Sequence, residues 1–184
     1  MSIFKGIVTG VLLCVSCAAL AQSPDQRAAE RVLGPHWKQV SRAAGLIFTG
    51  TVLSIERYAP TQDSPVPTFR VKFHVDRGVA GVRSGQVITI REWAAVWPMQ
   101  RPMRRAQRML LFFYPPSSAG LSSPVGGPMG QIAIDAKGNF GAGLPEAPVN
   151  DRAHVLRSPH TVVTQPDRLS QIERAIRSAR EGKE

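Results

Sequence analysis

Arginine and tryptophan side chains are concentrated between residues 93 and 108, together with Met99 and Met103. Guanidinium groups bind phosphate, sulfate and carboxylate groups through charge-assisted hydrogen bonds, and a neighbouring aromatic ring can stack on a base or another guanidinium group. This pattern predicts a binding surface for an anionic partner. The alternative is that the aromatic side chains cover one end of the fold while the arginines only face water. The residues assigned to the surface here are Trp93, Trp97, Arg101, Arg104, Arg105 and Arg108.

Serine hydrolysis is an alternative function for which the chain has the residue types. Ser122 or Ser123 would be the nucleophile, and His154 or His160 would be the base. The sequence has no Gly-x-Ser-x-Gly elbow, and a glycine-rich turn between strands explains the serine segment without any chemistry. We therefore predict that the chain is not an enzyme.

The histidines and acids lack the spacing of a metal site or of a pair of catalytic carboxylates. His36, His74, His154 and His160 are spread over the chain, and there is no H-E-x-x-H motif. The acids are scattered, and Glu92 is the only one beside the stretch rich in tryptophan and arginine. We predict neither a metal nor a cofactor.

The N-terminal residues have the pattern of a signal peptide. Lys5 precedes an apolar stretch, and Ala19 and Ala21 form an A-x-A cleavage site. The predicted location is secreted or periplasmic, with lipid anchoring at Cys17 as the alternative. Both cysteines of the chain lie in this leader, so the exported protein would have no disulfide, catalytic thiol or thiolate zinc site.

Charge and export together narrow the class of partner. The formal net charge of +10 raises the concentration of anionic molecules near the surface and carries no information about the fold. Export argues against intracellular nucleic acid. The predicted partner is therefore an extracytoplasmic protein or a polyanion such as a glycan or a lipid head group, and no membrane-spanning segment is expected in the mature chain.

Strands are the main elements that must position these residues. Residues 109–114 form the most apolar run after the leader, which predicts a central strand buried on both faces. Residues 69–76 alternate between apolar and polar types, so one face should be core while Arg70, Lys72 and His74 extend the predicted surface. Residues 94–108 are expected to form a long exposed loop. Further strands are predicted at 46–58, 87–93 and 131–135.

Four motifs in these strands follow one another at a recognisable spacing. They are Phe48-Thr49-Gly50-Thr51-Val52, Val75-Asp76-Arg77-Gly78-Val79, Gly85-Gln86-Val87-Ile88-Thr89-Ile90 and Arg108-Met109-Leu110-Leu111-Phe112-Phe113. The pattern resembles the netrin-like group, which includes the tissue inhibitors of metalloproteinases and bacterial secreted relatives. The resemblance implies a five-stranded OB-type barrel over about residues 46–135. Those inhibitors use an N-terminal cysteine and disulfides that the exported chain would lack, so their activity is not expected here.

The expected fold class is mainly β, with a five- to six-stranded antiparallel OB-like barrel, a short N-terminal helix and a C-terminal helix. The expected function is that of an exported non-catalytic domain that binds an extracytoplasmic protein or polyanion. The hydrolase and a structural role in an envelope assembly are the alternatives. The segments expected are a signal peptide at 1–21, a helical segment at 22–45, the barrel at 46–143, a Pro-rich linker with edge strands at 144–166 and an amphipathic helix at 167–184.

Overall fold

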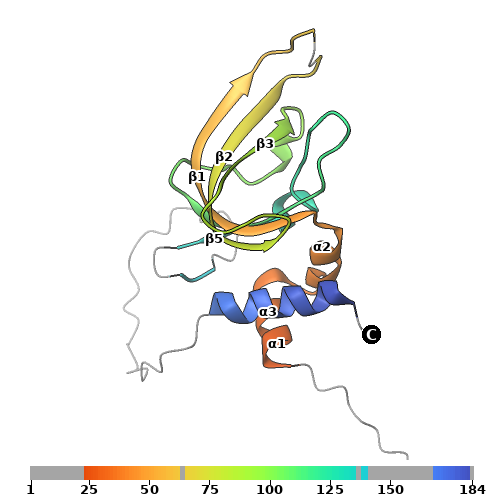
Figure 1. Cartoon of the computed structure of the whole chain (residues 1–184), viewed down its shortest axis with the longest axis vertical. Coiled ribbons are helices and arrows are strands. Elements are labelled where there is room, and N and C mark those ends of the chain that lie inside the picture. Colours follow the sequence, from red (N-terminus) through yellow and green to blue (C-terminus); the bar gives the residue numbers. More distant parts are fainter. Residues whose placement is uncertain (1–22, 63–64, 136–137, 141–167, 183–184) are drawn as a thin grey trace, which may run out of the picture.

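The computed structural model describes residues 23–62, 65–135, 138–140 and 168–182 (Figure 1). Five antiparallel strands form one sheet in the order β3-β2-β1-β4-β5, and helices lie at both ends of the chain. The expectation of a mainly β fold with flanking helices is confirmed. The strands are β1 (Leu46–Tyr58), β2 (Thr68–Ala80), β3 (Val87–Trp93), β4 (Arg108–Phe113) and β5 (Gln131–Ile134).

The helices begin where the sequence supplies helix-starting residues. The amide of Gln26 donates a hydrogen bond to the Ser23 side chain, and Pro24 occupies the first turn of the first helix. In the described part of the chain, no helix has the length and apolar character needed to cross a membrane. The helices are α1 (Pro24–Leu33), α2 (Trp37–Ala43) and α3 (Arg168–Glu181), with short 3-10 helices η1 (Trp97–Met99) and η2 (Gly127–Gly130).

β1 is the middle strand of the sheet and pairs with a neighbour on each side. It pairs with β2 from Ile47 to Tyr58, and its first residues also pair with β4. Gly50 lies at a register shift, and a Cβ atom there would stand 2.6 Å from the carbonyl oxygen of His74. Only glycine allows this approach, and the bulge increases the local bend and twist of the strand. The expectation that 109–114 would be the central strand is corrected by this order.

β4 is nevertheless buried on both faces, as its apolar sequence predicts. Leu110 and Phe112 belong to a core that α2 and α3 also line. Met109, Leu111 and Phe113 belong to a second core on the other face of the sheet. In this inner core the ring of Phe48 lies 5.5 Å from that of Phe73 and 6.3 Å from that of Phe113, measured between centroids. Such aromatic pairs stabilise a core beyond the area that they bury.

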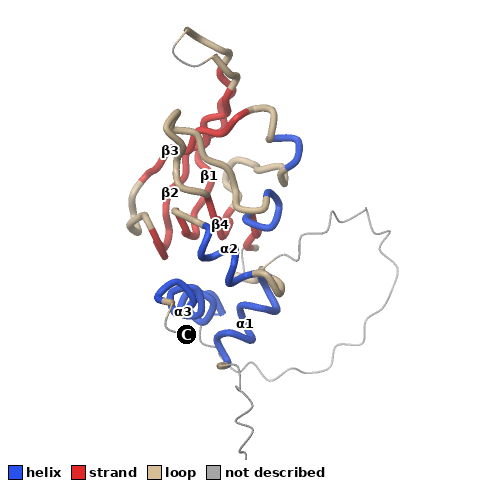
Figure 2. The backbone as a smooth tube through the Cα atoms, turned by 90° about the vertical axis from the view of Figure 1, so that its right-hand side faces the viewer, coloured by secondary structure: helices blue, strands red, loops and turns tan. Residues whose placement is uncertain are grey.

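Arginine side chains fasten α3 to the sheet and to the N-terminal helices. The three α-helices gather at one end of the molecule, while β1 and β2 extend away from them (Figures 1 and 2). Five arginines therefore have structural contacts at this junction. The pairs are Arg174 with Asp25, Arg77 with Glu173, Arg177 with the carbonyls of Gly78 and Val79, Arg180 with those of Ser41 and Ala44, and Arg42 with that of Ala179.

Strand pairing does not close the described sheet into a complete barrel, because β3 and β5 are not hydrogen-bonded to each other. Two other features span this gap. The segment 121–125 links β3 to β4, since the amide of Ser122 bonds the Arg91 carbonyl and Pro124 bridges Phe113. Side chains of the 94–107 loop make the second connection, which is described below.

Several expected element boundaries change. β2 continues to Ala80, beyond the alternating run at 69–76. Tyr114 lies past the end of β4 and is 40% exposed. The 94–108 segment is not one exposed loop, because it contains η1, buries Met103 and ends within β4. The leader and the 144–166 linker with its edge strands lie outside the described residues.

Candidate binding surface

One face of the sheet is covered by the helices at one end and is open at the other. On this face Ile47 of β1 and Phe112 of β4 lie beneath the helices. Because side chains alternate along a strand, Thr51 of β1 and Arg108 of β4 lie on the same face, in its open part. The open part continues across β2 and β3. We call this open part the basic sheet face; its side chains are Tyr58, Arg70, Lys72, His74, Arg91, Trp93 and Arg108, with the acids Glu56 and Asp76.

Two aromatic rings stand at the far end of the basic sheet face. Tyr58 on β1 and Trp93 on β3 are the two register neighbours of Thr68 on β2. The guanidinium carbon of Arg70 lies 4.0 Å from the centroid of the Tyr58 ring, within the range of a cation–π contact. Trp93 keeps 45% of its surface exposed. This end therefore offers one ring already stacked on a cation and one available for contact.

The next row of the basic sheet face places like charges opposite each other. Arg70 on β2 pairs directly with Arg91 on β3, and its neighbour on the other side is Glu56 on β1. Tyr58 and Ser54 donate hydrogen bonds of 2.7 and 3.1 Å to the Glu56 carboxylate, and these bonds lower its pKa. Like charges opposite each other weaken a strand pair. An anion bound over Arg70 and Arg91 would relieve this repulsion.

A network of polar contacts occupies the end of the basic sheet face that lies nearest the helices. Asp76 accepts a hydrogen bond of 3.0 Å from Arg108 Nε, and its other oxygen lies 3.0 Å from His74 Nδ1. Thr51 also donates to Asp76, at 3.4 Å. Arg108 is half-buried and engaged in an ion pair, so it has less freedom to bind a ligand than Arg70 or Lys72.

Trp97 and Arg101, both predicted to bind, are turned away from the basic sheet face. Trp97 stacks on Phe69 with ring centroids 4.3 Å apart, and it packs against the inner core. Arg101 donates from its guanidinium to the Gln131 carbonyl at 3.1 Å. These contacts fit the alternative in which the aromatic side chains of the loop cover the end of the fold.

Arg104 and Arg105 are exposed at a tight turn beside β1. The turn is held by hydrogen bonds of Val52 with Ala106 and Gln107, and Ala106 has a φ of 64°, which is unusual for a residue other than glycine. These two arginines therefore stand next to the β1 side of the sheet. Of the predicted residues, the structure gathers Arg70, Lys72, Trp93 and Arg108 on one face and leaves Arg104 and Arg105 near its border.

Tyr58 and Arg91 are the residues of this surface that sequence reasoning missed. Residues 87, 89, 91 and 93 share one face of β3, so side-chain alternation along the predicted strand 87–93 is the signal that could have placed Arg91 beside Trp93. Tyr58 joins the surface through its register with Thr68, which depends on three shifts in the pairing of β1 with β2. No local pattern in the sequence predicts those shifts.

The serine site of the hydrolase hypothesis has a structural use in the described fold. Ser122 is buried, and its hydroxyl donates a hydrogen bond of 2.7 Å to the Tyr114 carbonyl. The carbonyl of Ser123 accepts a bond from the Tyr114 amide. His154 and His160 lie outside the described residues. Within the described ranges, no three His, Cys, Asp or Glu residues form a cluster able to hold a metal ion.

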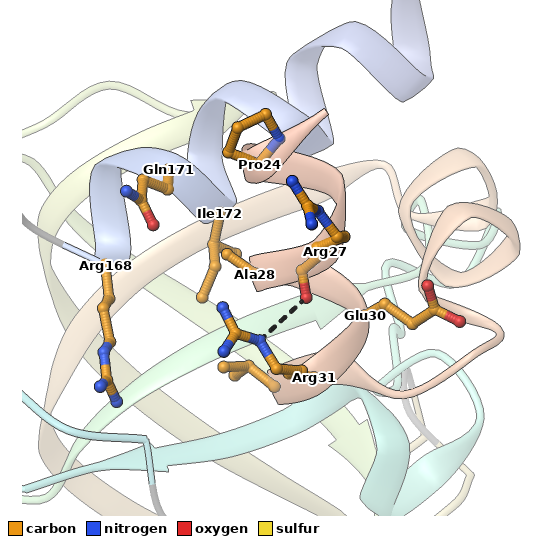
Figure 3. Close-up of a pocket in the computed structure, with 9 residues that line it drawn as sticks. Pro24, Arg27, Ala28, Glu30, Arg31, Arg168, Gln171 and Ile172 are labelled. Carbon is orange, nitrogen blue, oxygen red and sulfur yellow. Dashed lines mark hydrogen bonds between the residues drawn. The ribbon is translucent and has the colours of Figure 1, made fainter. Parts of the chain in front are cut away.

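A groove of about 900 Å³ between α1 and α3 is the other candidate region (Figure 3). Arg27, Arg31 and Arg168 line it, and the Arg31 Nε donates to the Arg27 carbonyl. Its apolar lining consists of Pro24, Ala28, Val32 and Ile172, of which Ala28 and Ile172 are buried. The residues that line the groove thus include arginines but no aromatic side chain, so the basic sheet face is the better candidate for a binding surface.

Comparison of the chain with protein-family models, with curated proteins and with solved structures finds no match.

Proposed function

We propose that this chain is an exported, non-catalytic binding module that recognises a polyanion through the basic sheet face. The observation that carries the proposal is the gathering of Arg70, Lys72, Arg91 and Trp93 on one open sheet surface, with two of the arginines directly opposite each other. Sulfate, phosphate or carboxylate groups on a repeating polymer would bridge such cations, and the exposed indole would pack on the units between them.

The resemblance of the strand motifs to the netrin-like group supports the same proposal. OB-type barrels use a sheet face to bind oligonucleotides and oligosaccharides. The signal-peptide pattern with Ala19 and Ala21 favours a partner outside the cytoplasm, and therefore a glycan or another extracytoplasmic polyanion. Arg104 and Arg105 stand at the border of the surface, where they would add long-range attraction for such a polymer.

Elution from heparin-agarose, a sulfated glycan matrix, tests the proposal with three double variants that each remove two positive charges. Arg70→Ala with Lys72→Ala changes the centre of the surface, and Arg104→Ala with Arg105→Ala changes its border. Arg27→Ala with Arg31→Ala changes the α1–α3 groove. We expect the central variant to elute at the lowest salt concentration, the border variant at an intermediate one, and the groove variant close to the wild type.

The matched charge of the three variants makes the result interpretable. If elution depended on net charge alone, all three variants would elute at the same reduced salt concentration, and this result would overturn the assignment of the site. Each changed side chain is exposed, so the variants should keep the wild-type fold, which circular dichroism checks. The hydrolase alternative is tested separately, because a serine-reactive fluorophosphonate should label Ser122 or Ser123 if either is a nucleophile.

A further inference from the structure

The last residues of β3 belong to two different environments. Arg91 and Trp93 point to the basic sheet face, while Glu92 between them points to the interior and is fully buried. Any movement of this strand end that exposes Glu92 must also move the two residues of the binding surface. The interactions that hold Glu92 in place therefore also help to position Arg91 and Trp93.

Side chains of Glu92, Gln100 and Gln131 form a chain of hydrogen bonds across the gap between β3 and β5. Gln100 Nε2 donates to Glu92 Oε2 at 2.8 Å, and Gln131 Nε2 donates to Gln100 Oε1 at 3.1 Å. The amide of Arg101 then donates to Gln131 Oε1 at 2.9 Å. Because Gln100 follows η1, this chain fastens the 94–107 loop to both edges of the sheet.

The Glu92 carboxyl has little to stabilise a negative charge. Among the described residues its Oε1 has no hydrogen-bond partner, and Oε2 accepts only from Gln100. Burial raises its pKa to about 7, against the smaller opposing effect of the Gln100 hydrogen bond. A buried carboxylate without a partner is costly, so the neutral acid is favoured at mildly acidic pH.

The elements packed around this carboxyl supply few charges to offset its ionisation. β2 presents Phe69, β5 presents Gln131, and the 121–125 segment contacts β3 through the amide of Ser122. The cations nearby are Arg101, which bonds Gln131, and Arg91, which lies on the opposite sheet face. The exposed Arg57 shares the face of Glu92 but stands two strands away in the register.

We propose that Glu92, Gln100 and Gln131 form a pH-operated latch that is closed with Glu92 protonated and loosens when Glu92 ionises. The closed latch holds the 94–107 loop over the inner core and keeps the end of β3 in place. Loosening frees the loop, exposes Trp97 and lets Arg91 and Trp93 move. The consequence for polyanion binding rests on the proposed function, whereas the latch itself does not.

Acrylamide quenching of tryptophan fluorescence between pH 5.5 and 8.5 tests the latch in the full chain without any ligand. Trp93 is 45% exposed and is quenched at every pH, so we expect quenching of the wild type to rise with a midpoint near pH 7 as Trp97 becomes accessible. Trp37 is buried in the helical layer and contributes a constant background. Glu92→Gln should stay weakly quenched throughout, because it keeps an acceptor for Gln100 and cannot ionise.

Two further variants serve as references. Gln100→Ala removes the middle of the latch and should be strongly quenched at every pH. Glu56→Gln removes an exposed carboxyl from the neighbouring strand β1 and should titrate like the wild type. The proposal is overturned if Glu92→Gln shows the wild-type pH dependence, since histidines or other groups would then be responsible, or if the wild type shows no dependence.

Heparin affinity measured over the same pH range separates the two proposals. If both hold, wild-type affinity falls above pH 7 more steeply than that of Glu92→Gln. If the quenching behaves as expected and neither protein binds heparin, the latch stands and the proposed function fails. If both bind with the same pH dependence while quenching shows no latch, the binding proposal stands alone.

Discussion

Gln100 donates a hydrogen bond of 2.8 Å to the buried carboxyl of Glu92, and this contact joins the 94–107 loop to the edge strand β3. The loop that the sequence predicts to be the binding element therefore also connects the two edges of the sheet. The strand to which it is fastened carries Arg91 and Trp93 on its other face. Residues 91 to 93 therefore contribute both to the connection across the gap in the sheet and to the proposed binding surface.

The stability of the protein should depend on pH through Glu92. Its folded-state pKa of about 7 exceeds the value of 4.5 expected in the unfolded chain. The folded state therefore binds the proton more tightly, and the free energy of unfolding falls as the pH rises from about 4.5 to 7. The loss is on the order of 3 kcal/mol. Urea denaturation at pH 5 and pH 8 measures it, and Glu92→Gln should remove most of the difference; an equal difference in that variant would contradict the assignment to Glu92.

Phe112 and Tyr114 allow the effect of removing a buried aromatic side chain of β4 to be compared with that of removing an exposed one next to it. Phe112 is 1% exposed beneath the helices, whereas Tyr114 is 40% exposed past the strand end. Phe112→Ala should lower the free energy of unfolding by about 3–5 kcal/mol, because it removes a buried ring and leaves a cavity. Tyr114→Ala should cost much less. Urea denaturation curves give both values, and similar losses would show that β4 does not have one helix-covered face.

Prediction from the sequence succeeded where local periodicity determines the structure. The alternation at 69–76 identified the core face of β2, and the apolar run at 109–114 identified a strand buried on both faces, although Tyr114 lies outside it. The helical segment predicted at 22–45 contains α1, which begins at a capping serine, Ser23, followed by Pro24. In each case the pattern lies within one element, so hydrophobic burial and helix capping act on neighbouring residues.

The features that the sequence did not reveal depend on contacts between distant residues. Alternation along β3 turns Glu92 inward, but no local pattern predicts that Gln100 bonds its carboxyl or that Gln131 bonds Gln100. Arg101 resembles the other arginines of its loop, yet it bonds the backbone of β5. The choice between a structural and a binding arginine is made by tertiary packing, which residue type and spacing do not encode.

Arg101 should therefore affect folding more than binding. Arg101→Ala removes the bond to the Gln131 carbonyl and should lower the free energy of unfolding by about 1 kcal/mol. Within the described ranges, the exposed Arg104 makes hydrogen bonds through its backbone alone, so Arg104→Ala should change stability by less than about 0.5 kcal/mol. Thermal denaturation compares the two variants, and equal melting temperatures would show that the Arg101 contact adds nothing.

Removal of Glu56 should strengthen binding of a polyanion. Glu56 is the acid beside Arg70, and its lowered pKa keeps it ionised at neutral pH. Glu56→Gln removes a negative charge from the basic sheet face and frees Arg70 from its attraction. Titration with a heparin oligosaccharide should give a tighter dissociation constant than the wild type at the same salt concentration. Weaker binding would mean that Glu56 contacts the ligand or holds Tyr58 in a required position.

The affinity of the variant Arg70→Ala with Lys72→Ala for a heparin oligosaccharide, measured by isothermal titration calorimetry at fixed salt, tests the central claim most directly. We predict a loss of roughly tenfold or more, because two charge-assisted contacts disappear from the centre of the surface. The variant Arg27→Ala with Arg31→Ala, which has the same net charge, should keep an affinity near that of the wild type. Equal losses in the two variants would show that binding follows overall charge and that the basic sheet face is not the site.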